Sequence, residues 1–309
     1  MQEKNYKQLI IPHNHRGYQF HTLYKAKVFV KDGNVVYSSL EEQNLIKNIP
    51  YLNTSILILG KGTSITSEAM NYLLNNKTIV MFVTNNFNLH GVAYPEDSLN
   101  TNKYARPLAK YIFDENKRLK LAKRMLLLRY EINQKLADKN EILKEIYSST
   151  KDTYEQRDLS NINSIEELLG VEGYYTKEFR NTFKNILGIE KGEINEEFNK
   201  RVKLINSLMY GLASIILTAF GLPLSFNVFH GRTNKGALKY DIADLFKGVS
   251  VMLASISLFP DFEDFYIANL NEEQLLKEFS NLLIKNFDII SLAFEETHNL
   301  LKEIESEEI

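Results

Sequence analysis

A long stretch without charged residues, from Leu204 to Phe229, restricts how this chain can fold more than any other feature. Its length raises the question of a membrane span, because crossing a bilayer takes roughly 20 apolar residues. Gly221 and Pro223 interrupt the stretch, however, and its small residues suit close packing of a helix inside a protein. We therefore expect a buried central helix, and keep a membrane-associated helical protein as an alternative.

The composition is that of a globular protein large enough for two domains, with 309 residues of which 44% are hydrophobic and 25% charged. The absence of cysteine excludes disulfides, thiolate zinc sites and cysteine nucleophiles. It also fits a reducing cytoplasm, where we expect the protein to reside. The first residues carry no long apolar run behind their charges, so we expect no secretory signal.

The first part of the chain predicts a small β-rich, sandwich-like domain with one helix, covering residues 1–95. Short apolar and β-branched runs indicate strands, and apolar residues at helical spacing indicate the helix. The predicted strands cover 24–30, 34–38, 53–59 and 78–83, and the predicted helix covers 64–75. Asp32 and Gly33 lie between the first two strands and are typical of a hairpin turn.

Helical periodicity dominates after a polar segment, 96–107, which predicts a linker. The predicted helices cover 108–139, 194–219, 241–258 and 272–302. We expect residues 108–309 to form a larger all-α catalytic domain. The expected fold class is therefore α+β, with two domains of different composition.

Charge is segregated along the second part of the chain. Residues 117–139 are mostly basic and residues 295–308 mostly acidic, although the formal net charge of the whole chain is only -2. A local basic face can bind DNA phosphates whatever the total charge. Solvated helix faces would give the same pattern, so both readings stay open.

Two acids and a histidine stand out in the second part. Asp241 and Asp244 lie three residues apart in a segment of helical character, which puts both on one face. Acids near a helix start are common, because they complement the helix dipole. His230 precedes them by eleven and fourteen residues across a glycine-containing loop. Histidine with carboxylates is what a mixed nitrogen and oxygen metal site requires, and a purely structural role is equally expected.

Glu172 is a third acid in an unusual setting. It lies in LLGVEGYYTKEF, after two leucines and beside Gly173, where a solvent-facing helix is not the obvious expectation. Gly170 and Gly173 would let backbone or substrate approach closely. A glutamate at a helix start facing water is the alternative.

Four motifs occur in a fixed order: ILILGKGTSITSEAMNYLL, LLGVEG, NSLMYG and FHGRTNKGALKYDIADLFK. Together they resemble the universal CRISPR adaptation integrase family over nearly the whole chain, and the spacings from His230 also fit. The Thr-Ser-Ile-Thr part of the first motif is similar to the version in subtype I-F systems. Asp244 occupies a position that is often glutamate in other subtypes.

The resemblance implies a metal-dependent DNA endonuclease and integrase of antiviral defence. Such an enzyme inserts short foreign DNA fragments into a CRISPR array by attack of a 3′-hydroxyl on a phosphodiester. By resemblance, Glu172, His230 and Asp244 are the ligands of Mg²⁺ or Mn²⁺, and Asp241 is the neighbouring acid that shapes the catalytic site.

The resemblance also implies partners. The family binds double-stranded DNA, both as the incoming fragment and as the CRISPR repeat. It works as a homodimer through its β-rich domain, and dimers are bridged by a small ferredoxin-like CRISPR-associated protein, which can be fused to a helicase-nuclease.

We expect basic and aromatic side chains near the site to contact DNA phosphates or bases. The candidates are Arg118, Lys123, Arg124, Tyr174, Lys177, Arg180, Arg232, Lys235 and Lys239. Two other functions stay open. One is a metal-dependent nuclease for branched DNA that never integrates, and the other is a catalytically silent nucleic-acid scaffold whose acids only cap helices.

Overall fold

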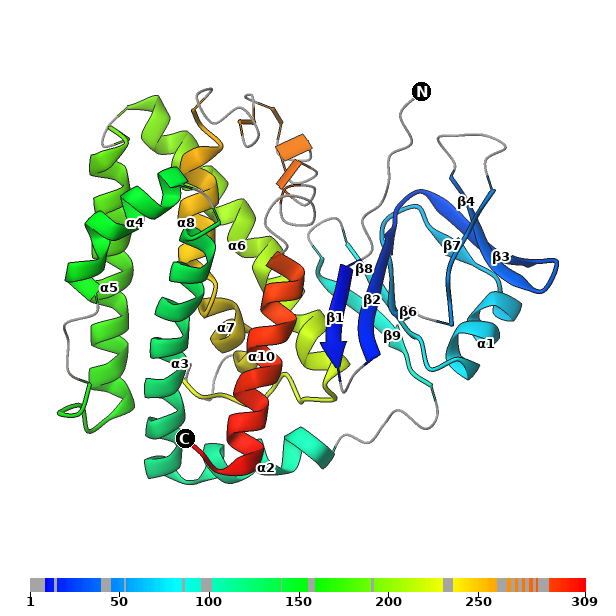
Figure 1. Ribbon diagram of the computed structural model, residues 1–309, viewed down its shortest axis with the longest axis horizontal. Helices are drawn as coiled ribbons and strands as arrows, with labels where there is room; N and C mark the ends of the chain where they lie inside the picture. Colours follow the sequence, from blue (N-terminus) through cyan, green and yellow to red (C-terminus); the bar gives the residue numbers. More distant parts are fainter. Residues whose placement is uncertain are drawn as a thin grey trace.

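The computed structural model consists of a β-rich part followed by a helical part (Figure 1). It describes residues 9–13, 16–39, 46–52, 54–84, 87–95, 102–139, 141–154, 159–189, 192–229, 236–259, 266–267, 270–271, 274–275, 278–279, 282 and 289–309. The predicted α+β class is confirmed.

The β-rich part contains two sheets of mixed strand direction. The five-stranded sheet has the order β1 (Leu9–His13), β2 (Arg16–Leu23), β6 (Thr54–Leu59), β8 (Ile79–Val83) and β9 (Leu89–Ala93). The four-stranded sheet has the order β5 (Ile46–Asn48), β4 (Asn34–Ser39), β3 (Ala26–Lys31) and β7 (Ser64–Ile65). Helix α1 (Ser67–Asn75) packs against this part, so the prediction of a β-rich region with one helix is confirmed for the residues described.

The last four residues of strand β6, 56–59, are all apolar because both faces of its sheet are covered. Ile56 and Ile58 belong to the core shared with the helical part, whereas Leu57 and Leu59 belong to a second core formed with α1 and the smaller sheet. Strands buried on both faces read as continuous apolar runs. The five-stranded sheet therefore separates two hydrophobic cores.

Local sequence determines two turns in the β-rich part, and the first of them was predicted. Asp32 and Gly33 have φ values of 50° and 73° and join β3 to β4 with Lys31 opposite Asn34, as a two-residue hairpin turn requires. The glycine-rich segment after β6 leads into α1, where the Thr66 side chain accepts a hydrogen bond from the Ala69 amide.

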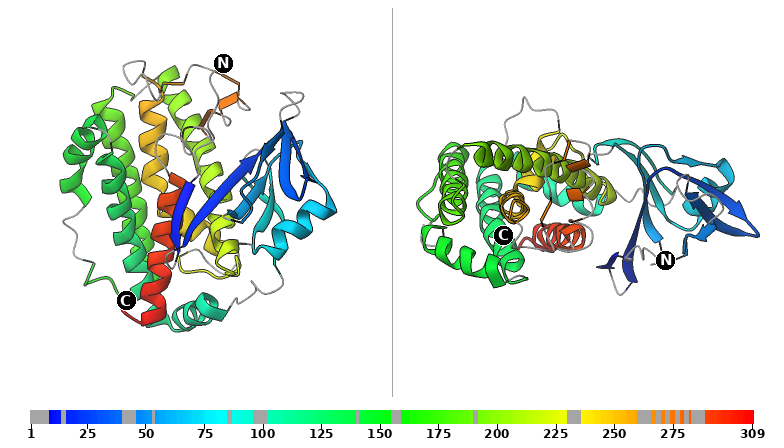
Figure 2. Two further views of the ribbon diagram at one scale, coloured as in Figure 1. Left: turned by 45° about the vertical axis from the view of Figure 1, so that its right-hand side comes forward. Right: turned by 90° about the horizontal axis from the view of Figure 1, so that it is seen from above.

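The described helices of the second part surround one extended core (Figures 1 and 2). They are α2 (Asn102–Phe113), α3 (Glu115–Ala137), α4 (Glu141–Tyr154), α5 (Ile165–Ile186), α6 (Glu193–Ala219), α7 (Ala237–Asp244), α8 (Lys247–Ile256) and α10 (Ile289–Ser306). The C-terminal helix α10 lies beside α2 and contacts β1, which joins the two parts of the chain. The Tyr94 hydroxyl also donates a hydrogen bond to the carbonyl of Thr218 in α6, at 3.3 Å.

Helix α6 contains the start of the uncharged stretch. Of the described helices it alone has the length and composition to cross a membrane, and 72% of its most apolar window is buried inside the structure. The prediction of a buried central helix is confirmed.

Several predicted boundaries were wrong. Helix α2 begins at Asn102, inside the segment expected to be a linker, because Tyr104, Leu108 and Tyr111 form a buried stripe at helical spacing. The predicted helix 108–139 is two helices, since the Asp114 side chain caps the start of α3.

The number of helices in the second part also differs from the prediction. The predicted helix 241–258 is divided into α7 and α8, and α4 and α5 were not predicted as helices at all. Much of 272–302 lies outside the described residues before α10. The division into domains 1–95 and 108–309 stays a prediction.

Candidate metal site

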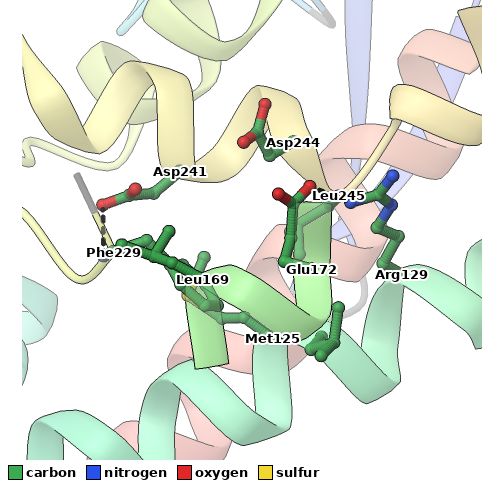
Figure 3. Close-up of a pocket in the computed structure, with 9 residues that line it drawn as sticks. Met125, Arg129, Leu169, Glu172, Phe229, Asp241, Asp244 and Leu245 are labelled. Atoms are coloured by element: carbon green, nitrogen blue, oxygen red, sulfur yellow. Dashed lines mark hydrogen bonds and ion pairs between the residues drawn. The ribbon is translucent and has the colours of Figure 1, made fainter. Parts of the chain in front are cut away.

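A small pocket between α3, α5 and α7 contains three of the four residues expected at the active site (Figure 3). Its acids are Glu172, Asp241 and Asp244. The other lining residues are Met125, Leu126, Arg129, Leu169, Phe229 and Leu245. Acidic groups thus lie among mostly apolar walls, which strengthens electrostatic interactions inside the pocket.

Glu172 faces inward because of its position on α5. The helix starts at the Ser164 cap, whose hydroxyl accepts a hydrogen bond from the Glu167 amide, and buries Leu168 and Tyr175 on one face. Glu172 follows Leu168 by one helical turn and therefore shares that face. Its side chain is only 16% exposed, so the alternative of a water-facing glutamate at a helix start is excluded.

Three donors converge on one oxygen of Glu172. Arg129 donates from Nη1 to Oε1 at 2.6 Å, and the Thr176 hydroxyl donates to the same oxygen at 2.9 Å. Lys247 Nζ lies 3.3 Å from it. Burial raises the pKa of Glu172, but the charges of Arg129 and Lys247 outweigh burial and lower that pKa to about 2. Glu172 is therefore ionised throughout the physiological range.

Lys247 joins the two acids of the pocket. Its Nζ lies 2.6 Å from Asp244 Oδ2 in addition to its contact with Glu172. The Asp244 side chain is 15% exposed, and burial raises its pKa although Lys247 acts in the opposite direction. The structure thus brings α5 and the end of α7 together around one ammonium group.

Asp241 has a different environment from Asp244, although the two share a helix. It is fully buried, and its Oδ2 accepts hydrogen bonds from the amides of Val228 and Phe229 at 2.6 and 3.3 Å. Figure 3 shows its carboxylate directed toward Phe229, whereas Asp244 lies near Glu172. Asp241 therefore fixes the segment that leads to position 230.

The third predicted ligand, His230, lies outside the described residues, as do Arg232 and Lys235. Within the described ranges, no group of three or more His, Cys, Asp or Glu residues is arranged to hold a metal ion. Phe229, which precedes His230 in the sequence, lines the pocket together with Glu172 and Asp244. The ligand set of Glu172, His230 and Asp244 stays a prediction.

The residues present fit a hard divalent cation. Two nearly buried carboxylates share one positively charged group, so the pocket requires a cation at this point. Mg²⁺ and Mn²⁺ prefer carboxylate oxygens as ligands over the nitrogen of an imidazole. The chain has no cysteine and so supplies no thiolate, and the sulfur on the described pocket wall is the thioether of Met125.

The described DNA-contact candidates lie in different environments. Two belong to internal contacts: Arg118 donates to the Val228 carbonyl at 2.8 Å, and Arg124 pairs with Glu303 and Glu131. Arg180 donates to Asn199, and Lys239 lies 4.7 Å from the centre of the Tyr240 ring. Lys123 is half-buried on α3, whereas Tyr174 and Lys177 are exposed on α5.

Sequence reasoning missed Arg129, Thr176 and Lys247. Arg129 was one of many basic residues in segment 117–139, and nothing local distinguishes it from its neighbours. Lys247 follows Asp244 by three residues, which is the spacing of a helical ion pair and was the one available signal.

Comparison with known proteins identifies the family. The family model described as "CRISPR associated protein Cas1" matches residues 21–266. "CRISPR-associated endonuclease Cas1" of Pectobacterium atrosepticum is 27% identical over 256 residues, which are 74% of this chain and 78% of that protein. The protein of the same name from Pseudomonas aeruginosa is 28% identical over 249 residues, 73% of this chain and 77% of that protein.

Solved structures share the fold. TtCas1 superposes with a TM-score of 0.67 at 19% identity, covering 92% of this chain and 97% of its own. A casposase bound to integration product superposes with a TM-score of 0.60 at 16% identity, covering 93% and 96%. Since the family model matches well over half of its length, the chain belongs to the CRISPR associated protein Cas1 family.

Proposed function

We propose that this protein is a divalent-metal-dependent DNA endonuclease and integrase, which inserts short DNA fragments into a CRISPR array. The observation that carries the proposal is the convergence of Glu172 and Asp244 on one cation in a pocket that Phe229 also lines. Membership of the Cas1 family supports it, since relatives are named endonucleases and one structural neighbour is bound to an integration product.

Glu172, Asp244 and His230 would hold the metal ion, Mg²⁺ or Mn²⁺. When bound, such an ion polarises a phosphodiester and stabilises the charge on the attacking and leaving oxygens of an in-line displacement. The attacking group in integration is the 3′-hydroxyl of the incoming fragment, and water in its place would give hydrolysis.

The surrounding residues orient the acids of the pocket and keep Glu172 ionised. Arg129 and Thr176 orient Glu172 through Oε1 and keep it ionised. Asp241 fixes the Val228–Phe229 backbone just before His230, which makes it a positioning residue. The apolar walls, including Met125 and Leu169, limit the water that reaches the pocket.

DNA would approach over the outer face of α5. This face carries Gly170, Gly173, Tyr174 and Lys177, and Tyr174 is 45% exposed. A Cβ atom added at either glycine would meet nothing within 4 Å, so a sugar-phosphate backbone could lie close to the helix beside Glu172. Lys177 would contact phosphate, and Tyr174 would stack on an exposed base.

Of the other candidates, Lys123, Arg180 and Lys239, together with Arg232 and Lys235, stay proposed phosphate contacts. Arg118 and Arg124 have internal partners, and we assign them first to the packing of α3. We also propose the family arrangement for partners and location: a homodimer through the β-rich domain, a small ferredoxin-like partner protein, and the cytoplasm.

A strand-transfer assay tests the function. A labelled fragment with a free 3′-hydroxyl is incubated with a supercoiled plasmid carrying a CRISPR repeat, with Mn²⁺, Mg²⁺ or a chelator. Asp244→Ala and Glu172→Gln should each reduce transfer at least about 100-fold, because a metal ion contributes several kcal/mol to the transition state. Glu166→Gln, an exposed acid in the first turn of α5, is the matched control and should retain activity.

The outcomes separate the alternatives. Cleavage without joining, even when fragment and repeat are present, would indicate a nuclease that never integrates. Metal-dependent processing that is absent from the wild type, or is unchanged in Asp244→Ala, would show that these acids have no catalytic role and would favour the scaffold.

A further inference from the structure

One lysine occupies the centre of the proposed metal site. Lys247 Nζ lies 2.6 Å from Asp244 Oδ2 and 3.3 Å from Glu172 Oε1, within the ranges of an ammonium group shared by two carboxylates. A cation that binds the same two acids therefore meets a positive charge that is already there.

The other two donors to Glu172 leave its second oxygen available. Arg129 and Thr176 both contact Oε1, and no described residue donates a hydrogen bond to Oε2. Arg129 is 6% exposed and also donates to the Thr176 hydroxyl at 2.9 Å, so its position is fixed from two sides. A metal ion can reach Glu172 through Oε2 without displacing Arg129.

Lys247 is built differently from Arg129. Its backbone is held at the start of α8 between Phe246 and Gly248, both buried, while its side chain is 25% exposed. Lysine carries a compact charge on a flexible stem of four carbons, so the ammonium group can move to solvent without a change in the backbone. Of the cations on the acid pair, Lys247 is therefore the one that can leave.

Electrostatic repulsion favours the departure of Lys247 when a metal ion binds the same acids. Two cations bound to the same pair of carboxylates repel each other strongly in a pocket with apolar walls. Without a cation between them, Glu172 and Asp244 would repel each other, and nothing would compensate the solvation that Asp244 loses on burial.

We propose that Lys247 is a displaceable counter-cation, which together with Arg129 balances the charges of Glu172 and Asp244 in the metal-free protein and is displaced from Asp244 when a divalent metal ion binds. This inference rests on the proposed metal-dependent function. It implies that the protein folds with an intact site before metal arrives, and that Lys247 lowers the affinity of the site for metal.

Calorimetric titration of the full chain with MnCl₂ at pH 8, without DNA, tests the proposal. Lys247→Met should bind Mn²⁺ at least fivefold more tightly than the wild type, because the competing charge is gone. Lys247→Gln should show the same gain, and Lys247→Arg, which retains a cation, should not. Lys200→Met is the matched control, since Lys200 also follows an acid, Glu197, by three residues but is not among the lining residues of the pocket.

Thermal melting supplies a second readout that does not depend on activity. Metal-free Lys247→Met should melt at a lower temperature than the wild type, and saturating Mn²⁺ should raise its melting temperature by more than it raises that of the wild type. If Lys247→Met does not fold, Lys247→Gln gives the same comparison.

The results distinguish this inference from the function on which it rests. Equal or weaker Mn²⁺ binding by both neutral variants would overturn the displacement proposal and leave the metal site intact. No Mn²⁺ binding by any of the proteins would overturn the metal site itself, and the displacement with it.

Discussion

Arg124 on α3 and Glu303 on α10 form a bidentate ion pair, with Nε–Oε2 and Nη2–Oε1 distances of 2.7 and 2.9 Å. Arg124 also donates to Glu131 at 2.9 Å, and the hydrogen bond to Glu303 is the main reason why the pKa of Arg124 is raised. The basic segment 117–139 and the acidic segment 295–308 thus meet along two neighbouring helices. Much of the charge segregation in the sequence serves to attach the C-terminal helix.

Arg124→Met should therefore destabilise the protein by about 1–2 kcal/mol, since bidentate pairs of limited exposure are stronger than ordinary surface pairs. Lys110→Met is the comparison, because it removes an exposed pair with Glu307, the residue directly after the end of α10. Urea denaturation should show a lower midpoint for Arg124→Met and an unchanged midpoint for Lys110→Met. Equal midpoints for both variants would show that Arg124 does not hold α10 in place.

Gly248 allows α8 to approach α3. A Cβ atom at this position would collide with the side chain of Asn133, which is buried and cannot move into solvent. Gly248→Ala should lower stability by about 1–3 kcal/mol, as overpacked cores do. Adding Asn133→Ala should recover part of the loss, because it removes the colliding atoms.

Gly170 is the matched helical glycine with open space around it. Gly170→Ala should raise the free energy of unfolding by roughly 0.5–1 kcal/mol, because alanine has the better helix propensity and nothing collides with it. Urea midpoints of the two alanine variants should move in opposite directions. A loss of stability in Gly170→Ala would mean that the outer face of α5 is covered.

The pKa of Glu172 predicts how stability depends on pH. A carboxyl pKa lowered in the folded state contributes stability that is fully present above the unfolded value and is lost as pH falls through the folded value. For a shift from 4.5 to about 2, this contribution is on the order of 3 kcal/mol. Glu172→Gln should be less stable than the wild type above pH 5, and the difference should shrink toward pH 2.

Urea denaturation of both proteins at several values between pH 7 and pH 2 measures that difference. A difference that stays constant over this range would mean that ionisation of Glu172 contributes nothing to folding, and that the ion pair with Arg129 does not stabilise the protein.

Asp241 and Asp244 should respond differently to the same substitution. Asp241→Asn weakens two charge-assisted hydrogen bonds in a fully buried place, which should cost about 1.5–3 kcal/mol of stability. Asp244→Asn should cost less, since burial already disfavours its charge. Mn²⁺ affinity should show the reverse order, with the larger loss in Asp244→Asn. A smaller loss of stability for Asp241→Asn than for Asp244→Asn would contradict a positioning role for Asp241.

The sequence alone was sufficient where a feature depends on neighbouring residues. Asp32 and Gly33 predict their turn because few residues adopt positive φ, and the Thr66 cap depends on an amide three residues away. The uncharged stretch of α6 predicts burial because moving its apolar side chains out of water lowers the free energy of the chain. Family motifs also drew attention to Glu172 and Asp244, which the structure brings into one pocket.

Only the tertiary structure decided which groups meet. The first part of helix α2, residues 102–107, was mistaken for a linker because the stripe that begins at Tyr104 gains its stability from packing against distant helices. Arg129 and Lys247 look like ordinary cations in the sequence, and only their distance from Glu172 makes them part of the site. Local preferences act over a few residues, whereas charge pairing and core packing depend on separation in space, which the order of residues does not fix by itself.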